Sequence, residues 1–193
     1  MRILGLPWYD WLIFVVAFLG AAAGIIYGLL RQYDRGFMKK NGNLLMWSKD
    51  RLPLLVSFTK DIPHEFCLVF RSIAQEVNAF VGRTVFGGVL VPWETNTGSG
   101  VCILLDILGE EGPGGTAEVK WNEKTGQILS ARVCIKNDLQ APDLDTAMRH
   151  EIGHALGLDH DDKSDSVMHP ETDHRSKKFT DRDAKLLRRA YAG

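Results

Sequence analysis

A chain of 193 residues has room for one domain of about 150 residues and a short appendage. Its formal net charge is −1, so it lacks the basic excess with which nucleic-acid-binding proteins hold phosphates. The composition thus argues against nucleic acid as a partner, and we interpret two local basic pairs, Lys177-Lys178 and Arg188-Arg189, as solvated surface.

The first predicted element is an uncharged stretch from Trp11 to Leu30. At 1.5 Å per residue, a helix of this length spans about 30 Å, the thickness of the hydrocarbon core of a bilayer. Aromatic residues flank both ends, as they do at membrane interfaces. We predict an N-terminal membrane anchor at 1–30, with a single-pass transmembrane helix at about 11–30. A cleaved signal peptide, which would place the domain at the cell surface or outside the cell, is the alternative, although its apolar region should be shorter.

Three glycines recur every four residues in this stretch: Gly20, Gly24 and Gly28. Such spacing lets a second helix approach closely and would allow self-association, although glycine is also frequent in membrane helices generally. More basic residues follow the stretch than precede it, which favours a cytoplasmic domain. Because the signal-peptide alternative places the domain outside, the side of the membrane stays open.

Residues 31–50 are polar and contain turn-forming Gly and Asn, which predicts a linker before a domain at 51–193. The domain begins with RLPLLVSFT at 51–59, which is typical of a strand. Apolar residues at three- and four-residue steps between Phe66 and Phe80 then predict an amphipathic helix.

Short apolar runs separated by turn residues predict further strands at 84–91, 101–108, 116–121 and 127–135. The last two flank a loop that ends at Gly126, which indicates a hairpin. Two helices are predicted at about 143–156 and 180–191, the second beginning at the capping pair Thr180 and Asp183. The order helix, twisted sheet, helix predicts an α+β domain.

The three cysteines lie far apart, each beside large apolar residues: Cys67, Cys102 and Cys134. We interpret them as buried thiols. Cys102 and Cys134 could form a disulfide if their strands lie side by side, which would leave the third thiol free.

The segment HEIGHALGLDH at 150–160 carries the chemistry. Residues four apart lie on one face of a helix, so His150 and His154 can present their imidazoles to one metal ion. Glu151 adjoins the first of these ligands and can reach a water on that ion without binding the metal itself.

Gly157 has a reason to be glycine, because the chain must leave the helix sharply there and glycine adopts the left-handed conformation at little cost. The bend brings His160 back as a third ligand. Three neutral imidazoles leave the fourth tetrahedral position open, which is the pattern of a catalytic zinc site.

The pattern HExxHxxGxxH followed by a methionine turn is the signature of the metzincins, and this chain resembles that family. Met168 in SVMHP, eight residues after His160, is the candidate methionine. Its spacing and the following Pro170 look most like the matrixins, the branch that includes the matrix metalloproteinases. The segments 112–119 (GPGGTAEV) and 179–193 (FTDRDAKLLRRAYAG) resemble the matrixin edge strand over the cleft and the closing helix.

The resemblance implies a metzincin (zincin-like) fold with a twisted mixed sheet, an active-site helix and a C-terminal helix. It also implies one catalytic Zn²⁺ on the three histidines and an apolar floor from Met168. The expected activity is that of a zinc metalloendopeptidase, which hydrolyses internal peptide bonds of proteins or peptides through a zinc-bound water activated by Glu151. The alternatives are a non-proteolytic zinc hydrolase and a membrane-anchored interaction protein with a vestigial zinc site.

Two features beside the third ligand allow more than one interpretation. His169 stands where matrixins usually have Tyr, and we interpret it as a wall residue. Four aspartates follow the helix: Asp159, Asp161, Asp162 and Asp165. They form either a solvated acidic loop, which we favour, or partners of the zinc ligands or of a structural Ca²⁺, which we do not predict.

Overall fold

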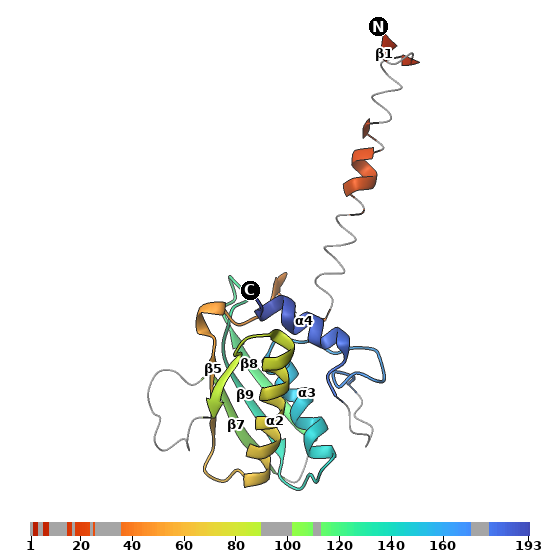
Figure 1. Cartoon of the computed structure of the whole chain (residues 1–193). Coiled ribbons are helices and arrows are strands. Elements are labelled where there is room, and N and C mark those ends of the chain that lie inside the picture. Colours follow the sequence, from red (N-terminus) through yellow and green to blue (C-terminus); the bar gives the residue numbers. More distant parts are fainter. Residues whose placement is uncertain are drawn as a thin grey trace. The chain divides into compact units, whose positions relative to one another are not determined.

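The chain forms two compact units in this computed structural model, residues 1–35 and residues 36–193 (Figure 1). In the second unit the structure describes residues 36–89, 102–109, 113–170 and 178–193, and in the first it describes short pieces up to residue 25.

The N-terminal unit contains two short paired strands, β1 (Arg2–Ile3) and β2 (Leu6–Pro7), and helical residues between 15 and 25. The transmembrane helix predicted at 11–30 falls largely outside the described residues, as do Gly24 and Gly28. No helix in the described part of the chain is both long and apolar enough to cross a bilayer. The membrane anchor therefore stays a prediction.

The second unit begins at Gly36, earlier than the linker predicted at 31–50 allows. Its first elements are β3 (Lys39–Lys40), β4 (Asn43–Leu44) and the 3-10 helix η1 (Lys49–Arg51). Three apolar side chains of this segment are buried in the core of the domain: Phe37, Leu45 and Trp47. Residues 36–50 thus belong to the domain. Exposed turn residues and buried core residues alternate in this segment, so its average polarity suggested a linker.

A five-stranded mixed sheet, in the order β6-β5-β7-β9-β8, forms one layer of the domain. Its strands are β5 (Leu54–Phe58), β6 (Phe86–Val89), β7 (Ile103–Leu108), β8 (Gly115–Trp121) and β9 (Ile128–Lys136). β8 runs antiparallel to β9, and the other neighbouring pairs are parallel. The predicted strands and the hairpin are confirmed, and β8 is an edge strand.

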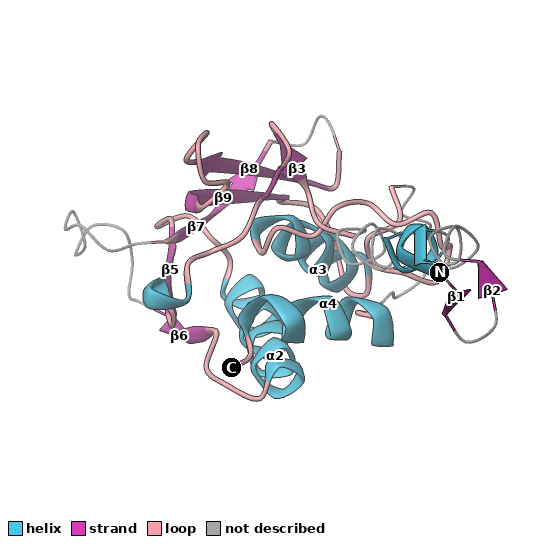
Figure 2. Ribbon diagram, turned by 90° about the horizontal axis from the view of Figure 1, so that it is seen from above, coloured by secondary structure: helices cyan, strands magenta, loops and turns pink. Residues whose placement is uncertain are grey.

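Three helices cover one face of this sheet: α2 (His64–Val81), α3 (Asp143–Ala155) and α4 (Asp181–Tyr191). Figure 2 shows them on the same side of the strand layer. α4 packs against α2 and begins with the predicted capping box of Thr180 and Asp183. The α+β architecture is therefore as expected from the order of elements.

The apolar stripe of α2 supplies the centre of the core. Its buried residues are Phe66, Phe70, Ile73, Val77 and Val81. The Phe70 ring meets Phe58 and Phe86 edge-on, with centroids 5.7 and 5.4 Å away, so the helix is fixed on two neighbouring strands. Burying such side chains stabilises the fold by about 1.5–3 kcal/mol each.

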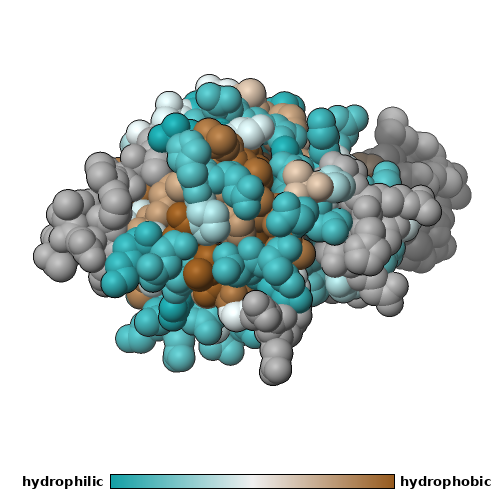
Figure 3. Space-filling view, turned by 90° about the horizontal axis from the view of Figure 1, so that it is seen from below, coloured by the Kyte–Doolittle hydropathy of each residue, from teal (hydrophilic) through white to brown (hydrophobic). Residues whose placement is uncertain are grey.

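The lower end of the domain in Figure 1 holds the N-terminal ends of α2 and α3. Seen from below, an apolar band crosses this face between hydrophilic residues (Figure 3). The loops leading into the two helices contribute the partly buried Ile62 and Leu139 and the exposed Asp61 and Asp138. This end therefore closes the core and carries charged residues at its surface.

All three cysteines are free thiols. The strands beside Cys102 and Cys134 are adjacent, but the register pairs Cys134 with Asp106, four residues beyond Cys102. Four residues of strand span about 13 Å, which is beyond the reach of a disulfide. The structure therefore excludes the disulfide that the sequence left open.

Candidate metal centre

The helix α3 carries polar residues into the interior. Arg149, His150 and Glu151 are only 4–7% exposed. The Arg149 guanidinium pairs with Asp145 one turn earlier and with Glu76 of α2, so its buried charge is compensated by two carboxylates. α3 is thus held by ion pairs as well as by apolar contacts.

Gly157 ends α3 in the way its sequence position predicts. Its φ is 89°, and the carbonyl oxygen of Leu45 occupies the place where a Cβ would lie. The Gly157 and Leu158 N–H groups donate to the carbonyls of His154 and Gly153, at 2.8 and 2.9 Å. These two bonds form a Schellman motif, which turns the chain back towards the helix.

The next two carbonyls of α3 are satisfied by side chains from distant parts of the chain. Trp47 Nε1 donates to the Ala155 carbonyl at 2.8 Å, and the Tyr191 hydroxyl donates to the Leu156 carbonyl at 2.6 Å. Burial raises the pKa of Tyr191, which keeps this hydroxyl protonated as a donor. The helix end is therefore closed on all sides, a role for Trp47 and Tyr191 that the sequence did not reveal.

The three predicted ligand histidines meet at one point. The Nε2 atom of His154 lies 3.1 Å from Nε2 of His150 and 3.2 Å from Nε2 of His160. Nitrogens at about 2.0–2.1 Å from a tetrahedral zinc ion would be about 3.3 Å apart. His150 is buried and His160 is exposed, so the site opens to solvent on one side.

Hydrogen bonds set the tautomers of the first two rings. The Nδ1 atoms of His150 and His154 lie 2.7 and 2.9 Å from the carbonyl oxygens of Val167 and Leu158. Because a carbonyl can only accept, each Nδ1 donates its proton and each Nε2 carries a lone pair. Two lone pairs facing at 3.1 Å repel unless a cation lies between them, so these residues fit a bound metal ion.

The protonation of His154 agrees with this role. Burial, together with the neighbouring imidazoles, lowers the pKa of His154 to about 4. The ring is therefore neutral near pH 7, which is the form that binds metal. Three imidazoles without a thiolate suit zinc among the divalent ions.

Glu151 lies under the edge strand β8. A Cβ on Gly115 would come within 2.6 Å of Glu151 Cγ and 3.1 Å of Oε1, so only glycine leaves room for this side chain. Burial raises the pKa of Glu151 to about 7. The sequence singled out the strand but not Gly115, because its role depends on a contact with a residue of another element.

Met168 is buried beside the metal centre. Its Sδ occupies the place where a Cβ on Gly153 would lie, one residue before His154. The Met168 N–H donates to Ser166 Oγ at 3.0 Å, and Ser166 Oγ donates to Asp183 of α4 at 3.3 Å. The capping box of α4 thus also holds the methionine turn.

The loop after His160 is only partly a solvated acidic loop. Asp162 and Asp165 are exposed, as is Asp159 just before His160, but Asp161 is buried and pairs with Arg182 of α4 at 2.6 Å. The Asp161 N–H also donates to the Met168 carbonyl at 2.9 Å. The interpretation as solvent-facing is therefore wrong for Asp161, which closes the loop against α4.

The remaining histidines lie outside this cluster. His64 is exposed at the start of α2, His169 is half-buried after Met168, and His174 lies outside the described residues. Among the residues that the structure describes, the three ligand histidines are the one group of three or more such side chains able to share a metal ion.

The fold and the three-histidine centre are those of a zinc metallopeptidase. A sequence model of the family described as Matrixin matches residues 94–192, just over half of the chain. The chain therefore belongs to the matrixin family. No curated protein matches it.

Proposed function

We propose that this metallopeptidase is an endopeptidase, in which Glu151 is the general base and His150, His154 and His160 hold one zinc ion. The observation that carries the proposal is the convergence of the three Nε2 atoms: that of His154 lies 3.1 Å from that of His150 and 3.2 Å from that of His160. The buried Glu151 lies on the same helix, next to His150.

The edge strand β8 supplies a binding surface for an extended peptide. β8 pairs with β9 on one side only, and its first residue, Gly115, lies over Glu151. A peptide that adds to this edge through main-chain hydrogen bonds would pass the general base. β8 continues from Gly115 to Trp121, so an added peptide would be held by this edge for several residues on one side of Glu151, which suits a polypeptide substrate.

Zinc, when bound, polarises the scissile carbonyl and acidifies the attacking water. The Glu151 carboxylate accepts the proton of that water and donates it to the leaving nitrogen. Gly115 leaves the space in which this carboxylate sits, and the Nδ1 hydrogen bonds of His150 and His154 fix the directions of the ligand nitrogens.

The test is Glu151→Gln, which keeps the size of the side chain and removes its basicity. We expect cleavage of an unfolded protein such as carboxymethylated casein to fall by about 10²–10⁴-fold, with zinc content unchanged. Unchanged cleavage with zinc still bound would refute the role of Glu151. Cleavage of small amides or esters alone, with no peptide of a library cut, would instead favour the non-proteolytic hydrolase. Equimolar zinc without any hydrolytic activity would favour the vestigial site.

The N-terminal stretch at 11–30 is proposed as a single-pass membrane anchor of this enzyme, and its length and lack of charge support the proposal. Full-length chain in vesicles should resist extraction by alkaline carbonate. Release into the supernatant would contradict anchoring.

A further inference from the structure

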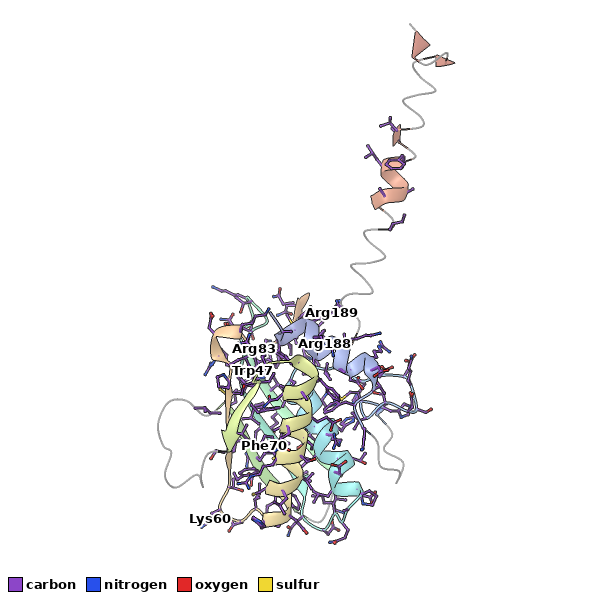
Figure 4. The ribbon with its side chains drawn as sticks, viewed as in Figure 1. Trp47, Lys60, Phe70, Arg83, Arg188 and Arg189 are labelled. Carbon is purple, nitrogen blue, oxygen red and sulfur yellow. The ribbon has the colours of Figure 1, made fainter. Side chains whose placement is uncertain are left out.

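Four cations gather where α2 and α4 end. Lys185, Arg188 and Arg189 are exposed and lie one turn apart on α4, so they share one face of that helix. Arg83 follows the C-terminal end of α2, and its guanidinium donates to the Tyr191 carbonyl at 3.4 Å. Figure 4 shows Arg83, Arg188 and Arg189 at the same end of the domain. The pair that the sequence assigned to solvated surface is thus part of a larger basic cluster.

Two of these cations, Arg83 and Arg188, make contacts that leave their charges in place. Arg188 Nε donates to the Phe80 carbonyl at 2.9 Å, and Arg83 also binds a carbonyl, so neither of these contacts neutralises a positive charge. On the exposed face of α4, the acidic residue is Asp181, one turn before Lys185. Arg83 and Arg188 therefore keep their positive charges at this end of the domain.

The opposite end of the domain carries negative charge. Asp61 and Glu65 are exposed at the start of α2, whereas Asp138 before α3 pairs with Lys136 at 3.3 Å. Lys60, labelled at that end in Figure 4, partly offsets them. The excess of cations at the basic cluster thus has no counterpart at this end.

The chain enters the domain beside the basic cluster. A Cβ on Gly36 would lie 2.5 Å from Leu186 Cδ1, and the Gly36 carbonyl accepts from the Asp159 N–H at 2.9 Å. The predicted anchor ends at Leu30, six residues before Gly36, and six residues reach at most about 20 Å. A domain tethered at Gly36 therefore has α4 within reach of the lipid headgroups.

We propose that the basic cluster (Arg83, Lys185, Arg188 and Arg189) docks on a bilayer surface that contains anionic lipid headgroups. The inference rests on the proposed membrane anchor but not on peptidase activity. Each cation close to an anionic bilayer favours the docked state about fivefold, and this attraction disappears at high salt. The tether adds to it by keeping the cluster at high local concentration near the membrane.

The experiment measures hydrogen exchange of α4 in the full-length chain, reconstituted in vesicles of phosphatidylcholine with or without about one third phosphatidylglycerol. We expect exchange in 179–193 to be about tenfold slower in the anionic vesicles, and the difference to vanish in about 0.5 M salt. The variant Lys185→Gln/Arg188→Gln/Arg189→Gln should lose this protection, because the docked state is disfavoured on the order of a hundredfold.

A matched control neutralises three exposed lysines away from the cluster, as Lys60→Gln/Lys120→Gln/Lys124→Gln, and should keep the protection. Circular dichroism in detergent shows that both variants are folded. Equal exchange in the two vesicle types, protection retained in the cluster variant, or protection lost in the control would overturn the proposal. Release of the chain by carbonate would overturn it as well. Protection without casein cleavage would instead refute the proposed function alone.

Discussion

The helices α2 and α3 pack on the same face of one sheet but are specified in different ways. α2 has 18 residues with an apolar stripe towards the core and exposed residues on the other side. α3 has 13 residues, and ten of them are buried, including Arg149, His150 and Glu151. α2 is defined by hydrophobicity, which any apolar residue of the right size can satisfy. α3 combines apolar contacts with individual polar ones, so we expect changes in α2 to affect mainly stability and changes in α3 to affect chemistry as well.

The largest difference is expected when one histidine is removed from each helix. His154→Ala removes a metal ligand, whereas His64→Ala removes an exposed ring at the start of α2. Loss of a partner that only orients a ligand costs about 10–100-fold in metal affinity, so loss of the ligand itself should cost more than about 100-fold. Zinc titration with a competing chelator measures this, with His64→Ala expected to match the unmodified chain. Equal affinity in both variants would contradict the assignment of His154.

The next change addresses the core side of α2. Phe70→Ala empties the space between Phe58 and Phe86 and should reduce the free energy of unfolding by about 3–5 kcal/mol. Denaturant unfolding of the detergent-solubilised chain measures the loss. At low denaturant, where the variant is folded, kcat should stay within about twofold, because the Phe70 ring packs against Phe58 and Phe86 of the sheet. A large fall in kcat of the folded variant would show that the packing of α2 also controls the chemistry at α3.

These contrasts explain how much the sequence alone could predict. The stripe of α2, the hairpin at Gly126 and the spacing of the three histidines are local patterns, so they identified the helix, the strands and the histidines that could share a metal ion. The capping of α3 joins Trp47 to Ala155, 108 positions away, and Tyr191 to Leu156, 35 positions away, and no local pattern records either contact. The same holds for Gly115 beside Glu151, and for Arg83 beside α4.

Gly153 offers a smaller test inside α3. Gly153→Ala should gain about 1 kcal/mol of helix propensity but force Met168 aside, at a cost of about 1–3 kcal/mol. The net result should be a destabilisation of about 1 kcal/mol. kcat/KM should fall about tenfold, because the displacement of Met168 reaches His154, next to Gly153. The double variant Gly153→Ala/Met168→Ala is the control, since it removes the overlap. The loss of kcat/KM in the double variant should be smaller than the combined losses of Gly153→Ala and Met168→Ala measured singly. A loss as large as the two combined would mean that Met168 is not the cause.

Tyr191→Phe tests the closure of the end of α3. The substitution leaves the buried Leu156 carbonyl without its 2.6 Å hydrogen bond and should destabilise the chain by about 1–3 kcal/mol. Thermal unfolding measures the effect. A neutral result would mean that water replaces the hydroxyl at the helix end.

The smallest effect is expected on the solvent face of α2. Leu68 is 51% exposed, so Leu68→Ala should change the free energy of unfolding by no more than about 0.5 kcal/mol. The same unfolding experiment checks it. A loss approaching that of Phe70→Ala would mean that this face is covered by another part of the assembly.

X-ray absorption at the zinc edge, on the purified full-length chain, is the most direct measurement of the metal centre. The structure predicts one zinc per chain with three imidazole nitrogens at about 2.0–2.1 Å and the remaining position filled by a light atom. Fewer than three imidazoles, a sulfur ligand at about 2.3 Å, or no bound zinc would contradict the assignment of His150, His154 and His160.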